Sequence, residues 1–313
     1  MRCDDFGFRF KAMASTCEVR IGGLARQRAA SLAAKAIAEV RRIEAKYSRY
    51  RADSVVGRIN ASAGSGCALD VDAETAHLLD FAAGLWAASD ALFDITSGVL
   101  RKAWDFRAAR LPRAGELDAL LPRVGWQRVS WDGRSIALPL AGMELDFGGF
   151  GKEYAADRAA TLLQGLGVVS GLVNLGGDIR LVGARPDGSP WLLGVQDPRD
   201  TARLLARLPL ASGALATSGD YERFFERDGR RYCHVLDPRS GWPVEHWRSV
   251  SVVAPACLAA GALTTVAMLK GAAALEFLAT QGVVCIAVDG AGRVHERRGA
   301  GAGARIDRSL EAA

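Results

Sequence analysis

The sequence has few cysteines and histidines, and neither set has the spacing of a metal site. Six of the 313 residues are Cys and four are His, and they are scattered along the chain. No C-x2-C pair and no HExxH motif occurs, which argues against a zinc ribbon, a thioredoxin-type motif and a zinc-hydrolase helix. We interpret the cysteines as buried or free thiols, which favours a reducing compartment.

An excess of charge of one sign is also absent. The chain has 40 Lys and Arg against 35 Asp and Glu, a formal net charge of +5. Its basic runs are only pairs, whereas a nucleic-acid-binding surface normally gathers many basic residues. We therefore expect no nucleic-acid partner. Half of the residues are hydrophobic, which is enough to bury a sizeable core and excludes wholesale disorder.

We expect neither a secretory leader nor a membrane span. The alternating pattern of a strand begins at Phe6, with no apolar stretch of about 7–15 residues before it. Residues 249–269 carry no charge and are long enough to span a bilayer. Because they begin with the alternating SVSVV and contain Pro255, we predict a strand, a proline turn and a buried helix. The predicted location is the cytoplasm, with the periplasm as the alternative if a leader has been removed.

Hydrophobic periodicity predicts a mixed chain of helices and strands. A strand pair is expected over 6–23, followed by a helix of about 20 residues around 32–47. Further helices are expected over 73–88, over 152–163 and from 258 onward. Further strands are predicted at 126–129, 135–138, 171–174, 179–182, 191–195, 214–217, 232–236, 250–253 and 283–288. Strict βαβ alternation is missing. The prediction is therefore an α+β fold with mostly antiparallel sheets and flanking helices.

Several glycine-bearing polar turns are candidates for a binding site. The segment DFGGFGK at 146–152 is not a phosphate-binding P-loop, because Glu153 stands where Ser or Thr would bind magnesium. Its glycines nevertheless allow close backbone approach, and the helix that begins at Lys152 suits a phosphate. Asp146 could hold a ring N–H or a hydroxyl. The alternative is an ordinary strand-to-helix turn with a solvated Lys152.

Eight short blocks follow one another along the chain: MAST at 13–16, YSRY at 47–50 with Ser54 and Asn60, FDIT at 93–96, DFGGFGK at 146–152, VNLGGD at 173–178, TSGDY at 217–221, HVLDP at 234–238 and AGALTT at 260–265. In this order they resemble the ApbE family of FAD:protein FMN transferases. The resemblance implies a T-fold-like ApbE domain over residues 1–298, with two lobes about an FAD cleft. A loose Ala/Gly-rich tail is expected over 299–313.

The resemblance also implies a reaction and the residues for it. The family binds FAD and Mg²⁺, and transfers FMN to a Thr or Ser hydroxyl of a partner protein with release of AMP. FAD contacts would fall at Met13, Tyr50, Ala91, Leu92, Phe93, Asp94, Asp146, Lys152 and Val235. Mg²⁺ would bind the carbonyl of Gly149 and the side chain of Thr265. Lys152 would steady negative charge, and His234 would assist the attack or the departure of AMP.

One departure from the family pattern concerns the metal. The family has Asp four residues before the metal-binding Thr, where this chain has Gly261. Loss of a carboxylate should weaken Mg²⁺ binding, so FAD hydrolysis and FAD binding without catalysis are the alternative functions. Glu153 replaces the family's Gly after Lys152, and would either repel the pyrophosphate or replace the missing ligand. We expect an Asp at position 261 to be tolerated, since a helical glycine needs no special conformation.

Overall fold

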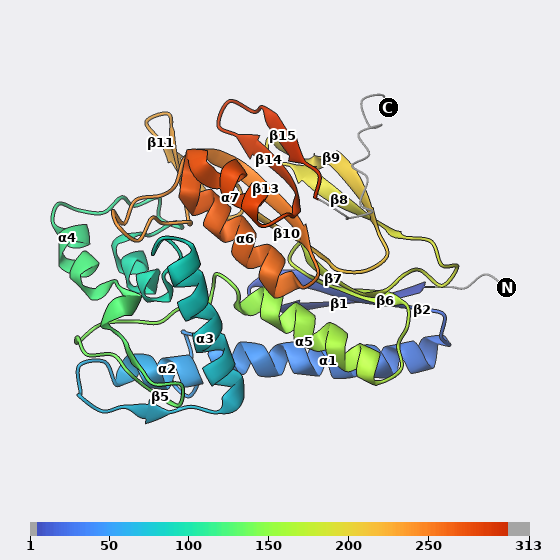
Figure 1. Ribbon diagram of the computed structural model, residues 1–313, viewed down its shortest axis with the longest axis horizontal. Helices are drawn as coiled ribbons and strands as arrows, with labels where there is room; N and C mark the ends of the chain where they lie inside the picture. The colour runs from blue at the N-terminus through green and yellow to red at the C-terminus, as the bar shows by residue number, and fades with distance from the viewer. Residues whose placement is uncertain (1–4, 300–313) are drawn as a thin grey trace.

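The computed structural model describes residues 5–299, which are built around one eight-stranded antiparallel sheet (Figure 1). The strand order is β1-β2-β6-β7-β10-β13-β14-β15, and every neighbouring pair is antiparallel. The strands are β1 (Asp5–Ala12), β2 (Ser15–Gly22), β6 (Gly171–Leu175), β7 (Asp178–Gly183), β10 (Ala214–Gly219), β13 (Trp247–Ala254), β14 (Val284–Asp289) and β15 (Val294–Arg297). The predicted α+β fold with antiparallel sheets is confirmed.

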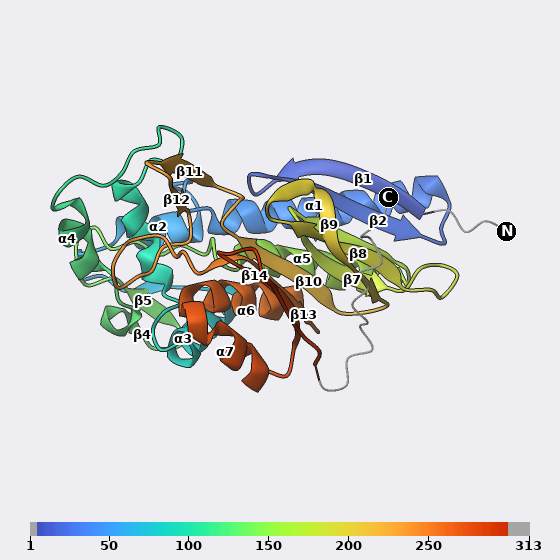
Figure 2. The ribbon, with the colours of Figure 1, turned by 90° about the horizontal axis from the view of Figure 1, so that it is seen from above.

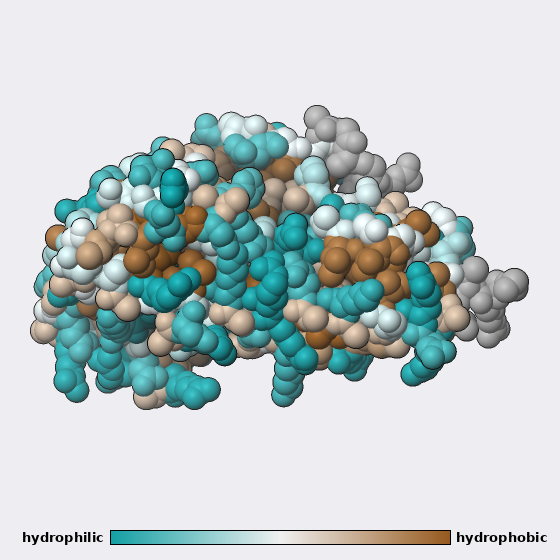
Figure 3. All heavy atoms as spheres, turned by 90° about the horizontal axis from the view of Figure 1, so that it is seen from below, coloured by the Kyte–Doolittle hydropathy of each residue, from teal (hydrophilic) through white to brown (hydrophobic). Residues whose placement is uncertain are grey.

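Three helices cover one face of this sheet, on its lower side in Figure 1. They are α1 (Arg26–Tyr47), α5 (Gly151–Gly165) and α6 (Cys257–Lys270). The buried side chains of α1 include Leu32, Val40 and Ile43, spaced so that they share one helix face. They pack with Val19 and Ile21 of β2 in the largest hydrophobic cluster. Seen from below, hydrophilic side chains cover much of the outer surface, with separate hydrophobic areas between them (Figure 3).

A hairpin of β8 (Trp191–Asp197) and β9 (Asp200–Leu210) covers the opposite face. Alternate residues of β8 are buried, and Trp191, Leu193 and Val195 pack onto strands of the main sheet. Strand β9 was not predicted from the sequence, because Pro209 lies within it and proline argues against a strand. A register shift at Gln196, which pairs with Leu204, also interrupts the ladder.

Residues between α1 and α5 form a separate layer at the left of Figure 1. It contains α2 (Val55–Ala61), α3 (Ala73–Ala88), η1 (Ile95–Ala103), α4 (Glu116–Leu120), η2 (Leu121–Arg123), η3 (Trp126–Arg128), and a small sheet of β3 (Leu69–Asp70), β4 (Ser130–Trp131) and β5 (Ser135–Ala137). The strand predicted at 126–129 is wrong. The Trp126 amide donates to the Asp94 carboxylate at 2.8 Å, and this long-range bond holds a 3₁₀ turn.

The predicted strand at 232–236 is also shorter than expected. The hairpin of β11 (Phe224–Arg227) and β12 (Arg230–Cys233) ends at Cys233, so His234 lies in the segment that follows. The last described strand ends at Arg297. The predicted tail, apart from residue 299, lies outside the described residues.

The uncharged stretch folds as predicted, with β13, then Pro255, then α6. In the described part of the chain, one helical stretch is long and apolar enough to cross a membrane, Cys257–Thr280. It comprises α6, η4 (Gly271–Ala273) and α7 (Ala274–Thr280). Since α6 packs against α5, β10 and β13, and lies beside α7 and β13 in Figure 2, its apolar residues serve the core of the fold.

Candidate functional site

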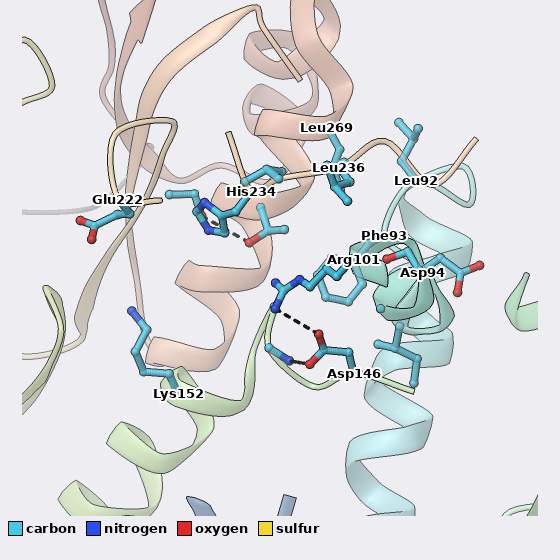
Figure 4. A pocket seen from close by; sticks show the side chains of 18 of the residues that line it. Leu92, Phe93, Asp94, Arg101, Asp146, Lys152, Glu222, His234, Leu236 and Leu269 are labelled. Carbon is cyan, nitrogen blue, oxygen red and sulfur yellow. Dashed lines mark hydrogen bonds and ion pairs between the residues drawn. The ribbon is translucent and has the colours of Figure 1, made fainter. Parts of the chain in front are cut away.

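A cavity of about 210 Å³ lies where the layer between α1 and α5 meets α5, α6 and the end of β10 (Figure 4). Many of the predicted site residues line it: Leu92, Phe93, Asp94, Asp146, Gly149, Lys152, His234, Val235 and Thr265. They come from segments far apart in the sequence, so the fold gathers the DFGGFGK, HVLDP and AGALTT blocks around one space.

Four predicted site residues lie outside this cavity lining. Met13 lies in the β1–β2 turn, where its backbone N–H donates to the Glu44 carboxylate at 2.5 Å. Tyr50 is 79% exposed. Ala91 has a left-handed backbone with φ of 63°, and Gly261 is buried in α6. Their assigned contacts with FAD or metal therefore stay predictions.

The Asp146 carboxylate is held between two guanidinium groups. Its Oδ2 lies 3.0 Å from Arg49 and 3.5 Å from Arg101, and its Oδ1 accepts the Gly148 amide at 2.8 Å. Figure 4 shows Arg101 reaching across the cavity to this carboxylate. Burial alone would raise the pKa of Asp146, but Arg101 and Arg49 outweigh it and lower the pKa below its usual value. Asp146 is thus a fixed anion.

Residues of the 47–60 block position the Asp146 loop. The Asn60 amide clamps Leu145, donating to its carbonyl at 3.0 Å and accepting its N–H at 2.7 Å. Ser54 caps α2 through the Gly57 amide. Through the contacts with Leu145, this block holds the Asp146 loop at the cavity although it lies far from Asp146 in the sequence.

The backbone of Asp94 borders the cavity, while its carboxylate binds other residues of the protein. The side chain accepts from the Thr96 amide and hydroxyl and from the Trp126 amide, at 2.6–2.8 Å. In Figure 4 it points away from Arg101 and Asp146. Asp94 therefore shapes the loop that presents Leu92 and Phe93 to the cavity.

The Lys152 ammonium forms an ion pair with Asp178 of β7. The carboxylate of Asp178 is buried and also accepts the Thr217 amide at 3.0 Å. Burial would lower the pKa of Lys152, but the charges of Asp178 and Glu153 raise it above its usual value. Lys152 is therefore not a solvated cation at the helix start, and it stays charged in the cavity wall.

His234 lines the cavity as a neutral imidazole. Its Nδ1 is buried without a hydrogen-bond partner. Burial, together with the nearby charges of Arg101 and Arg223, lowers the pKa of His234 to about 4. The ring therefore has one unpaired nitrogen and no charge near neutral pH.

The Gly261 position is filled by Glu153. A Cβ atom built on Gly261 would lie 2.4 Å from Glu153 Cγ, so the expectation that an Asp at 261 fits at little cost is wrong while Glu153 is present. Glu153 is buried, and its Oε2 has no hydrogen-bond partner. Burial, reinforced by the Asp178 charge, raises the pKa of the Glu153 carboxyl well above its usual value, although Lys152 opposes this.

Hard oxygen donors lie together at this end of the cavity. Thr265 and Ser218 hydroxyls are 3.3 Å apart, and Ser218 also contacts the Thr264 hydroxyl at 2.8 Å. Among the described residues, no group of three or more His, Cys, Asp or Glu side chains could hold a metal. A cation here would therefore depend on backbone and hydroxyl oxygens as well as on carboxylate.

The cavity lining also includes Arg101, Glu222, Leu236 and Leu269, which were not predicted from the sequence. No motif pointed to Arg101, because it lies several residues after the FDIT block. It faces the cavity only because η1 turns the chain there. The complete wall has cations near Asp146 and α5, and apolar side chains from the 92–93 and 236 segments (Figure 4). The fold and cavity thus define a protein whose site can contact both polar and apolar parts of a ligand.

Comparison with known proteins agrees with this class. The model of the ApbE family matches residues 13–287, and the chain belongs to this family. It is 31% identical to the FAD:protein FMN transferase of Salmonella typhimurium over 83% of this chain and 77% of that protein. It is 34% identical to one from Klebsiella pneumoniae over 79% of each.

Solved structures with the same fold include two from this family. The ApbE protein of Thermotoga maritima has a TM-score of 0.86 at 30% identity, covering 94% of this chain and 97% of that one. The apo form of the flavinyl transferase ApbE of Pseudomonas stutzeri has a TM-score of 0.81 at 32% identity, covering 94% and 95%. The similarity therefore extends over nearly the whole fold.

Proposed function

We propose that this chain transfers FMN from FAD to a Thr or Ser hydroxyl of an acceptor protein and releases AMP, with Mg²⁺ as the metal. The observation that supports it most is one cavity that joins Asp146, Lys152, His234 and Thr265, in a chain whose relatives are named FAD:protein FMN transferase. Their position in one cavity is what supports a reaction, because residues scattered over the surface could not act on the same ligand.

The cavity wall has groups for each part of FAD. Arg101 supplies a guanidinium, which binds phosphate oxygens through paired N–H donors. Helix α5 begins at Gly151 with no side-chain cap, so the positive end of its dipole favours an anion there. The apolar side chains of Phe93 and Leu236 suit a flat ring system.

The transfer breaks the phosphoanhydride bond of FAD and forms a phosphoester bond to the acceptor. The acceptor oxygen bonds to the phosphorus of the FMN half, the bond from that phosphorus to the bridging oxygen breaks, and AMP leaves with the bridging oxygen. Neutral His234 has an unpaired Nδ1 that can accept the proton of the attacking hydroxyl. Lys152, held charged by Asp178, steadies the negative charge on the phosphate oxygens.

The residues present fit a hard divalent cation. Gly149, Glu153 and Thr265 line the same cavity, and they offer a carbonyl, a carboxyl and a hydroxyl oxygen, the donors that Mg²⁺ prefers. Bound Mg²⁺ would supply Lewis-acid neutralisation of the pyrophosphate. The buried Glu153 Oε2 without a partner supports this fit.

The test is incubation of the purified protein with FAD, Mg²⁺ and a panel of peptides that each carry one Thr. We expect a peptide whose mass increases by FMN, together with an equal amount of AMP, and no adduct on the matched Thr→Val peptide. FMN and AMP without an adduct would instead indicate a hydrolase. Bound FAD that stays intact would indicate a binding protein, and either result contradicts the proposal.

A further inference from the structure

Glu153 on α5 occupies the space that a side chain at residue 261 on α6 would need. A Cβ atom on Gly261 would lie 2.4 Å from Glu153 Cγ, 2.9 Å from its Cδ and 3.0 Å from its Oε1. Protein interiors are close-packed, so two side chains cannot share this volume. The missing side chain at 261 is therefore what admits the Glu153 carboxyl, and the α5–α6 contact fixes its place.

One oxygen of this carboxyl is buried without a partner. Glu153 is 7% exposed, and its Oε2 makes no hydrogen bond. The neighbouring Lys152 is already paired with Asp178. A buried carboxyl oxygen without a partner is destabilising. Since Glu153 lines the cavity, a ligand in the cavity can satisfy this oxygen.

Further oxygens of the same cavity complete a set of hard donors. Thr265 lies four residues, about one helical turn, after Gly261 on α6. Its hydroxyl is oriented by Ser218, 3.3 Å away. Gly149 lies just before α5 and also lines the cavity. A carboxylate, a hydroxyl and a carbonyl together favour a divalent cation over a phosphate or an organic anion.

We propose that Glu153 supplies the carboxylate ligand of the divalent cation in this cavity, from the place that an aspartate at residue 261 would hold. The inference rests on the proposed function, because it names the residue that holds the metal for that reaction. The competing interpretation of the same contacts is a protonated Glu153 that only fills space beside Gly261 and Asp178.

The first test measures binding of Mn²⁺ alone to the full chain, by electron paramagnetic resonance of the free ion. Glu153→Gln keeps the shape of the side chain and removes its charge. We expect this variant to weaken Mn²⁺ binding at least about ten-fold. Loss of a residue that only supports a metal ligand already lowers metal affinity by about that factor, and loss of the ligand itself should lower it no less. Glu276→Gln is the matched control, an exposed carboxylate of α7 that does not line the cavity. Its Mn²⁺ affinity should stay within about three-fold of wild type.

The second test moves the carboxylate from one helix to the other. Gly261→Asp alone should lower the melting temperature without strengthening Mn²⁺ binding, since Glu153 fills the space. Glu153→Gly alone should lose Mn²⁺ affinity. The double variant Glu153→Gly/Gly261→Asp should recover at least about ten-fold in Mn²⁺ affinity over Glu153→Gly, with a melting temperature close to that of wild type.

Two results would overturn the assignment. One is a folded Glu153→Gln protein whose Mn²⁺ affinity stays within about two-fold of wild type. The other is a folded double variant that binds Mn²⁺ no better than Glu153→Gly. FMN transfer to the acceptor peptide is followed on the same samples. Wild type that binds Mn²⁺ through Glu153 but transfers no FMN contradicts the proposed function alone, whereas transfer with Mn²⁺ binding insensitive to Glu153 contradicts the ligand assignment alone.

Discussion

Lys152 and Asp178 form an ion pair that links the first turn of α5 to the start of β7 beside the cavity. The carboxylate of Asp178 is 2% exposed and has the Thr217 amide as its other partner. This relationship changes the role expected of Lys152, because the ammonium that faces the cavity also neutralises a buried charge of the fold.

Lys152→Ala should therefore destabilise the protein as well as weaken FAD binding. From the sequence alone, alanine at a helix start costs little. Removing one partner of a buried pair instead leaves an uncompensated charge, so the free energy of unfolding should fall by about 3 kcal/mol. Urea denaturation measures this. Arg51→Ala, which breaks the exposed pair with Asp53, should leave the midpoint unchanged, and an unchanged midpoint for Lys152→Ala would contradict the structural role.

Asn60→Ala should weaken FAD binding although Asn60 does not line the cavity. The variant removes both hydrogen bonds to Leu145 and frees the loop that presents Asp146. Backbone groups left without partners should cost about 1–3 kcal/mol of stability. FAD fluorescence quenching and thermal denaturation measure the two effects. An affinity equal to that of wild type, with lowered stability, would show that the clamp does not position Asp146.

Gly98→Ala should impair the site, whereas Gly84→Ala should not. A Cβ at Gly98 would lie 2.5 Å from Asp146 Cβ and 3.0 Å from Arg49 Nη1, so the Asp146 loop must shift at a cost of about 1–3 kcal/mol. A Cβ at Gly84 of α3 meets no atom within 4 Å, and alanine there should stabilise the helix by about 0.5–1 kcal/mol. The melting temperature should fall for Gly98→Ala and rise for Gly84→Ala, and FAD affinity should fall for Gly98→Ala only. Equal effects would count against the packing explanation.

The stability of the ligand-free protein should depend on pH through His234. Its pKa is about 4 in the folded chain, against 6.5 as the ordinary value. Between these two values the unfolded chain binds a proton that the folded chain does not, so stability is lost as the pH falls from 6.5 toward 4. His234→Asn should flatten this part of the profile, measured by urea denaturation at several pH values. His77→Asn, on the exposed side of α3, is the control that should keep the wild-type slope.

The regular elements were predictable because their patterns are local. The strand pair predicted over 6–23 and the helical spacing of α1 and α3 depend only on neighbouring residues, and the structure has these elements. The 3₁₀ turn at Trp126 was not predictable, because it depends on the distant Asp94 carboxylate. Strand β9 was not predicted because Pro209 lies within it.

Nine of the predicted site residues line one cavity, but their contacts could not be predicted from the sequence. Motif order placed Asp146, Lys152 and His234 at one cavity. The partner of Lys152, however, depends on the turn between β6 and β7, which brings Asp178 beside α5. Likewise, nothing in the spacing of residues 153 and 261 indicates that their side chains compete for one volume.

That competition limits how such a chain can change over time. The α5–α6 contact has room for the side chain of Glu153 or for one at residue 261, but not for both. If single substitutions move the carboxylate between these helices, one intermediate protein must have either both side chains or neither. The first intermediate is crowded at the α5–α6 contact. The passage without either side chain is the sterically open one, so the acidic group would be lost before it is regained on the other helix.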